Sequence, residues 1–290
     1  MTLGAVAVAA TLAGARFFLA GDGTIALVSA HSGEKASVTY RRADGTYDPD
    51  ALAKIRRVMR SRDGAEGDVS LRLVEMLAHV YAARGKQPLR IQSGYRSPDY
   101  NEQIRARGAK AAGGSLHTEG LAADVAFPPK ELRPLWLKIR ELDCCGAGYY
   151  RSNGFLHLDV GRPRFWEPAT SKVDENLSAG NARLFARTDY DRYTPGDAIV
   201  VTLHAMTTPP VLIAKEATLI DATGKHPVHV DSSTPTREGC LDVTDRGVHL
   251  RVTNVPDAER ARIVLKTCEP RVEKTPETIE TNAIEVRAAR

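Results

Sequence analysis

Residues 115–124 read SLHTEGLAAD, and they connect one histidine to one aspartate through a glycine-containing turn. His117 and Asp124 are seven residues apart, and Gly120 between them, with Gly113-Gly114 just before, predicts a tight loop. We expect this loop to deliver His117 beside the strand that carries Asp124. An imidazole and a carboxylate brought together in this way are candidate metal ligands.

A second histidine lies in residues 148–161, which read GYYRSNGFLHLDVG. Asn153-Gly154 is the favoured pair of a type I′ turn, and aromatic or apolar residues flank it, so the segment predicts a β-hairpin. Because side chains alternate along a strand, Phe155, His157 and Asp159 face the same side. Two imidazoles and one carboxylate make a three-ligand zinc site with a position open for water, which is the catalytic pattern. On spacing alone, ordinary hydrogen bonds at strand ends are the commoner explanation of such a trio.

Proline after an N-cap residue predicts two helices before this region. The first begins at Asp48-Pro49 and runs to about Arg60, and the second begins at Ser97-Pro98 and ends at Gly108. Between them, Leu89–Gln92 predicts a short strand.

Helical periodicity predicts two more helices. One covers Val69–Arg84 and places Glu75 and His79 on its polar face, so we expect His79 to be solvated rather than a ligand. The other follows the first candidate ligands, with Pro134 in its first turn. Helices and strands mixed in this way predict an α+β fold.

Several motifs follow one another in order through this part of the chain. They are Ser93-Gly94-Tyr95-Arg96-Ser97, Asn101, Ser115-Leu116-His117, Gly120, Ala122, Asp124, Gly148-Tyr149-Tyr150 and Phe155-Leu156-His157-Leu158-Asp159. Together they resemble the murein endopeptidase K-like branch of the zinc D-Ala-D-Ala peptidases, over about residues 25–166. Several motifs in the right order are much more specific than any one of them.

The resemblance implies a hedgehog/D,D-peptidase-type α+β domain that hydrolyses amide bonds in peptidoglycan stem peptides or their cross-links. It also implies one zinc ion, Zn2+, held by His117, Asp124 and His157. Zinc lowers the pKa of bound water toward about 7 and polarises the scissile carbonyl. A carboxylate must still accept and relay the proton.

The general base is not fixed by the resemblance. Better-known carboxypeptidase and dipeptidase relatives carry Glu or Asp three residues before the last zinc histidine, whereas this chain has Gly154 there. Asp159 is the base we predict, because it shares a strand face with His157. The alternative role of Asp159 is to orient a zinc ligand. Glu119 is a third possibility, although a simple loop acid explains it as well.

Arg96 is the predicted anchor for a substrate carboxylate or a transition-state oxyanion. It precedes the predicted N-cap Ser97, where a helix N-terminus favours anions, and the resemblance supports the same role. The alternative is a surface arginine paired with Asp99 or Glu102. Further predicted substrate contacts are Ser97, Ser115, Tyr149 and Tyr150. Packing within the hairpin is the alternative for the two tyrosines.

The carboxy-terminal part of the chain has a different pattern. After a linker predicted over residues 167–182, residues 183–290 contain short β-rich runs separated by turns and no helical pattern. This spacing predicts an all-β, immunoglobulin-like sandwich that binds a protein or a cell-wall ligand.

Residues 1–24 are signal-like. The apolar, Ala-rich run ends in Ala13-Gly14-Ala15, which suits a signal peptidase, but it lacks a basic start, so a buried first strand or helix is the alternative. We expect a periplasmic or secreted protein, in which Cys240 and Cys268 can form a disulfide. For Cys144-Cys145 we expect two small buried residues rather than a bond or a metal site.

Composition excludes several classes of protein. Lys+Arg 40 against Asp+Glu 36 gives a net charge of only +4, which argues against a nucleic-acid partner. After the amino terminus, no stretch approaches the roughly 18 apolar residues that cross a membrane. The two function classes that remain are a zinc peptidase acting on peptidoglycan and a non-catalytic, zinc-containing module that binds the wall.

Overall fold

The computed structural model describes residues 16–107, 115–142, 144–161, 164–167, 184–205, 211–233, 236–243, 248–269 and 275–288. The chain divides into two compact units, Met1–Asp174 and Glu175–Arg290. Residues 1–15 of the leader predicted over 1–24, the end of the helix at Gly108, Gly113-Gly114 and nearly all of the predicted linker lie outside the described residues. Among the described residues, no helix is long and apolar enough to cross a membrane.

A mixed sheet of seven strands forms the centre of the first unit, in the order β2-β1-β3-β4-β6-β5-β7. Its strands are β1 (Thr24–Ser29), β2 (Lys35–Thr39), β3 (Leu89–Ser93), β4 (Ala122–Ala126), β5 (Gly146–Tyr150), β6 (Phe155–Asp159) and β7 (Arg164–Trp166). The β1–β3 and β5–β7 pairs are parallel, and the other pairs are antiparallel. The first unit is therefore mixed α and β, as the sequence predicts.

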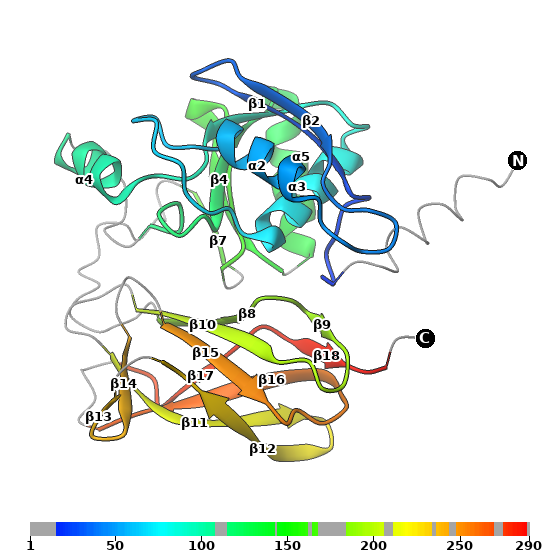
Figure 1. Cartoon of the computed structure of the whole chain (residues 1–290). Helices are drawn as coiled ribbons and strands as arrows, with labels where there is room; N and C mark the ends of the chain where they lie inside the picture. The colour runs from blue at the N-terminus through cyan, green and yellow to red at the C-terminus, as the bar shows by residue number, and fades with distance from the viewer. Residues whose placement is uncertain are drawn as a thin grey trace, which may run out of the picture. The chain divides into compact units, whose positions relative to one another are not determined.

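The helices of this unit are α2 (Pro49–Val58), α3 (Leu71–Ala83), α4 (Pro98–Ala106) and α5 (Pro129–Glu141). α2 packs against β1 and β2, α3 against β1, and α5 against β5 and β6. α4 lies apart from α2 and α3 (Figure 1). Asp48 and Ser97 cap α2 and α4 with their side-chain oxygens, so both predicted helix starts are confirmed.

Strand alternation separates two faces of the central sheet. Ile91, Val125 and Leu156 lie opposite one another on β3, β4 and β6, and all three are buried. The neighbouring positions Asp124 and His157 therefore point to the other face. The hydrophobic core thus fixes which face carries the candidate ligands.

The β5–β6 hairpin is confirmed, but its predicted type I′ turn is wrong. Arg151–Asn153 form a short 3-10 helix (η1), and Gly154 follows in a left-handed conformation with φ 70°. Tyr150 pairs with Phe155, so four residues connect the strands instead of two. A type I′ turn needs positive φ at both central residues, and Asn153 does not adopt it.

The predicted polar face of α3 is wrong at Glu75. Its carboxylate is completely buried and accepts hydrogen bonds at 2.7 Å from the Arg41 guanidinium and the Tyr40 hydroxyl. The backbone N–H of Gly21 also donates to it, which ties the segment before β1 to α3. His79 is partly exposed, as expected.

Two smaller predictions also need correction. Pro134 lies inside α5, because the helix begins five residues earlier, at Pro129. Cys144 and Cys145, expected as unbonded buried residues, form a disulfide between α5 and β5.

The second unit is all β in its described residues. Its strands are β8 (Leu184–Thr188), β9 (Arg192–Tyr193), β10 (Ile199–Ala205), β11 (Val211–Asp221), β12 (Gly224–Asp231), β13 (Thr236–Arg237), β14 (Cys240–Val243), β15 (Val248–Thr253), β16 (Ala258–Thr267), β17 (Thr278–Glu280) and β18 (Ile284–Val286). The main path runs β8-β10-β15-β12-β11-β16-β18-β9. Alternate residues of β10, β11, β15 and β16 form one buried core. The predicted Cys240–Cys268 disulfide is confirmed.

Candidate metal centre

Strand register places the candidate site in one row across five strands. Ser93 lies opposite Asp124, Asp124 opposite His157, His157 opposite Gly148, and Gly148 opposite Trp166. Residues paired in this way have neighbouring side chains on the same face. A β-carbon at position 148 would lie 2.6 Å from the Trp166 ring, so only glycine lets that ring lie across the row. The Trp166 ring centroid is then 5.2 Å from that of His157.

His117 reaches this row from the loop before β4. The N–H of Thr118 donates to the carbonyl of Ser115, and the N–H of Gly120 donates to the carbonyl of His117. Gly120 has φ +64°, and its α-carbon leaves room for the Asp68 carbonyl, which a β-carbon there would meet at 1.8 Å. The tight loop predicted around Gly120 is therefore present in its described part.

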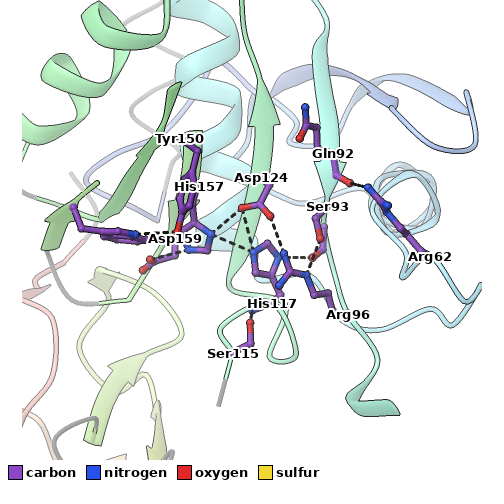
Figure 2. Close-up of polar contacts among 12 residues, drawn as sticks. Arg62, Gln92, Ser93, Arg96, Ser115, His117, Asp124, Tyr150, His157 and Asp159 are labelled. Atoms are coloured by element: carbon purple, nitrogen blue, oxygen red, sulfur yellow. Dashed lines mark hydrogen bonds and ion pairs between the residues drawn. The ribbon is translucent and has the colours of Figure 1, made fainter. Parts of the chain in front are cut away.

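Three ligand atoms converge where the loop meets the row (Figure 2). His117 Nε2 is 3.2 Å from His157 Nδ1, and Asp124 Oδ1 is 2.9 Å from His157 Nδ1 and 3.4 Å from His117 Nε2. One ligand atom from each residue lies within 4.8 Å of the other two. The structure thus brings together the three residues that the sequence nominates as metal ligands.

Each of these residues has a second polar atom held by the protein. His117 Nδ1 donates to the carbonyl of Gly94 at 2.7 Å, which leaves the Nε2 lone pair directed at the cluster. Asp124 Oδ2 accepts from Arg96 at 2.7 Å. His157 Nε2 lies 3.3 Å from Asp159 Oδ2. Partners of this kind fix the tautomer and orientation of metal ligands.

Electrostatics favour the metal-binding protonation state of His117 and Asp124, but not of His157. Burial and the neighbouring Arg96 guanidinium lower the pKa of His117 to about 4, so its ring is neutral at pH 7. Burial works to raise the pKa of Asp124, but His117 and His157 outweigh it and hold that pKa well below its usual range. Burial works to lower the pKa of His157, but hydrogen bonds to Asp124 and Asp159 raise it overall.

The donor set fits zinc. A neutral imidazole, an ionised carboxylate and a second imidazole are the nitrogen and oxygen ligands that zinc takes, and three protein ligands leave a fourth position open. Among the described residues, this is the group of histidine, cysteine and carboxylate side chains whose atoms come close enough to hold an ion.

Asp159 contacts the ring nitrogen of His157 that points away from the cluster. Its carboxylate is fully buried, and its Oδ1 accepts from the N–H of Gly161. Of the two roles left open by the sequence, this placement favours orientation of His157. Glu119 is partly exposed, and its carboxylate lies 3.5 Å from the Thr118 hydroxyl, not among the three converging ligand atoms.

Arg96 contacts one of the three converging ligands, and its predicted role as an anchor for a substrate anion stays a prediction. Its Nε donates to Ser93 Oγ at 2.9 Å and its guanidinium pairs with Asp124, not with Asp99 or Glu102. Ser97 Oγ accepts from the N–H of Tyr100 as the cap of α4 and donates to Asp63.

The other predicted substrate contacts occupy different surroundings. Ser115 Oγ accepts from the N–H of His117 and so supports the ligand loop. Tyr150 is on the His157 face, stacks on Phe155 and accepts a hydrogen bond from Trp166 Nε1. Tyr149 points to the opposite face, where it packs on Trp136 of α5, and its contact with substrate stays a prediction.

The sequence analysis missed Trp166. The register that brings it beside His157 depends on a parallel β5–β7 pair, which the local sequence does not reveal. A glycine at position 148, opposite the last ligand, was the available signal, because it marks a close approach.

Comparison with known proteins gives the same assignment as the motifs. The family model described as peptidoglycan L,D-endopeptidase MepK matches residues 20–166. The chain belongs to this family. The peptidoglycan L,D-endopeptidase MepK of Escherichia coli (strain K12) is 30% identical over 144 residues, which cover 49% of this chain and 79% of that protein. A probable MepK of Haemophilus influenzae is 27% identical over 140 residues, covering 47% and 75%.

The family assignment confirms the resemblance drawn from the ordered motifs. The MepK match begins before β1, ends at Trp166 and includes all three converging ligands. It does not extend into the second unit.

Proposed function

We propose that this chain is a zinc-dependent peptidase that hydrolyses amide bonds in the stem peptides or cross-links of peptidoglycan. The observation that carries the proposal is the convergence of His117, Asp124 and His157 within 4.8 Å, in a family whose members are named peptidoglycan endopeptidases. The three residues would hold one zinc ion. When bound, zinc lowers the pKa of water toward about 7 and polarises a carbonyl, which supplies the nucleophile and the activated bond.

The residues around the three ligands would orient them for zinc binding. His117 is neutral because burial and the Arg96 guanidinium lower its pKa, and its Nδ1–H donates to the carbonyl of Gly94, which directs the Nε2 lone pair at the cluster. Arg96 holds the second oxygen of Asp124, and we assign it as a positioning residue for that carboxylate. Asp159 does the same for His157. The Trp166 ring packs at a tilt beside His157 and would shield one side of that ring from solvent.

The location in the cell envelope is part of the proposal. Two disulfides, Cys144–Cys145 and Cys240–Cys268, support an oxidising compartment such as the periplasm or the exterior. We further propose an immunoglobulin-like sandwich for the second unit, supported by its strand pairs, which are antiparallel except for β9–β18 among the described residues, and by its alternating burial. Its role would be to bind a protein or the wall.

Mass spectrometry of cross-linked muropeptides tests the activity. Zinc-loaded protein is compared with a chelated sample and with the His157→Ala variant. We expect product from the zinc-loaded protein alone, and the product mass identifies the bond that is cut.

Zinc binding without product from any muropeptide would contradict the peptidase proposal. That result would favour the second candidate, a zinc-containing wall-binding module. The observation behind this candidate is that Gly154 replaces the expected acid while Asp159 is engaged by His157 and Gly161.

A further inference from the structure

A shallow depression lies at the β7 edge of the central sheet. It has a volume of about 310 Å³ and is lined by Trp136 and Arg140 of α5 together with Phe165, Trp166 and Glu167. Trp166 belongs to both places, because its ring contacts His157 and also lines the depression. Trp136 packs on Tyr149 on the opposite face of the sheet, so a substrate bound at the metal centre would reach the depression by passing over Trp166 at the β7 edge.

The aromatic walls offer ring surfaces and no polar groups. Trp136 Nε1 donates to the carbonyl of Ala147, and Trp166 Nε1 donates to the hydroxyl of Tyr150. These two hydrogen bonds hold both indoles in place and use their only donors. Phe165 has no polar atom. A ligand that packs on these walls must offer them an apolar C–H surface.

The rim of the depression carries a positive side chain, Arg140, and a negative one, Glu167. Arg140 lies with its guanidinium carbon 5.9 Å from the Trp136 ring centroid, and both Arg140 and Glu167 are exposed. Together they supply hydrogen-bond donors and acceptors. A ligand that fits must have an apolar face for the rings and a polar edge for the rim.

We propose that this depression binds a pyranose ring of the glycan strand to which the peptidase's stem peptides are attached. A pyranose has axial C–H groups on its face and hydroxyl and acetamido groups on its edge, which match the walls and the rim respectively. The inference rests on the proposed function, because peptidoglycan joins peptide and sugar in one polymer. The depression would make the enzyme prefer peptides that still carry their sugar.

Tryptophan fluorescence tests sugar binding without any need for turnover. The chain contains two tryptophans, and both line the depression. Titration of the full chain with the β-1,4-linked trimer of N-acetylglucosamine should give a saturable change in emission, and sorbitol, which has no ring, should give none. Arg140→Ala should weaken the response, whereas Arg133→Ala, exposed on the same helix but outside the depression, should not.

Kinetics test whether the sugar belongs to the substrate. We compare a cross-linked peptide dimer with the same dimer carrying its disaccharides. In Trp136→Phe and Arg140→Ala, KM for the sugar-bearing dimer should rise roughly two- to tenfold, the loss expected for one aromatic or polar contact. KM for the sugar-free dimer and kcat for both should stay unchanged.

The outcomes separate this inference from the proposed function. An equal rise in KM for both dimers would mean that the depression contacts peptide, and no fluorescence change up to the solubility of the trimer would mean that it binds no sugar; either result overturns the inference. Absence of turnover by the wild type would overturn the proposed function instead, and the fluorescence titration would still decide the sugar site.

Discussion

His157 has a carboxylate at each of its two ring nitrogens. Asp124 lies 2.9 Å from Nδ1 and Asp159 lies 3.3 Å from Nε2. Nδ1 faces His117 and the converging ligand atoms, so Nε2 and Asp159 lie on the far side of the ring. We therefore expect Asp159 to affect the reaction through the orientation and basicity of His157.

Replacing Asp159 with asparagine should weaken zinc binding. The Asp159→Asn side chain keeps its size but loses the charge that supports the His157 ring, so zinc affinity should fall about 10- to 100-fold. Turnover should recover when zinc is added in excess. Competition with a fluorescent zinc chelator measures the affinity, and muropeptide hydrolysis measures the turnover.

A different result would restore the base assignment for Asp159. If Asp159→Asn bound zinc as tightly as wild type and still lost turnover, the carboxylate would be handling the proton itself. Glu119→Gln serves as the matched comparison, because it removes the charge of the other candidate base.

Two elements of the first unit, helix α3 and the ligand loop before β4, contact parts of the chain that are distant in sequence. Glu75 on α3 binds Arg41, which follows β2, and the N–H of Gly21, which precedes β1. Gly120 lets the ligand loop pass against the carbonyl of Asp68. Each contact joins parts of the chain that are distant in sequence.

Glu75→Gln should be strongly destabilising. It leaves the Arg41 guanidinium buried beside a neutral amide, and an uncompensated buried charge costs about 3–5 kcal/mol. Urea unfolding followed by circular dichroism measures the loss in the free energy of unfolding. Glu34→Gln is the control: it breaks the solvent-accessible pairs with Arg57 and Arg60 and should cost far less. Equal losses in the two variants would contradict the structural role of Glu75.

Gly120→Ala and Gly154→Ala form a matched pair. Both glycines have positive φ, 64° and 70°, but a β-carbon at 154 meets nothing within 4 Å. Gly154→Ala should cost only the conformational penalty, about 1 kcal/mol. Gly120→Ala should cost several times more and also lose zinc, because the loop must move away from Asp68. Similar losses in urea unfolding and unchanged zinc affinity would show that the loop has room to adjust.

Local chemistry explains which elements could be predicted from sequence. Asp48-Pro49 and Ser97-Pro98 predict the starts of their helices, because an N-cap side chain binds backbone N–H groups in the first turn of its own helix. The burial of Glu75 cannot be predicted from local sequence, because its partner Arg41 is 34 residues away. The hairpin loop was misjudged because Asn153-Gly154 suits more than one connection, and only the register at Tyr150 and Phe155 selects the four-residue loop.

At the scale of the whole molecule, the two units carry separate stabilising features. The candidate metal centre and both tryptophans belong to the first unit, and the Cys240–Cys268 disulfide belongs to the second. The ligands could be predicted because strand alternation and ordered motifs identify them. The aromatic wall at Trp166 could not, because it forms only when β7 pairs with β5.

Removing the Cys240–Cys268 disulfide should destabilise the second unit alone. The bond closes a separation of 28 residues, for which chain entropy predicts about 3–4 kcal/mol. In Cys240→Ser/Cys268→Ser, the far-ultraviolet circular dichroism transition should begin at lower urea, while the tryptophan transition of the first unit should not move. A shift of both transitions would mean that the units unfold together.

The central claim is that one zinc ion, held by His117, Asp124 and His157, carries the peptidase activity. The most direct test titrates chelator-treated protein with zinc while following bound metal and muropeptide hydrolysis in the same samples. We predict that hydrolysis rises with bound zinc and reaches its plateau at one ion per chain, and that Asp124→Ala neither binds zinc at that concentration nor hydrolyses substrate. Full hydrolysis by the metal-free protein, or stoichiometric zinc binding and activity in Asp124→Ala, would contradict the claim.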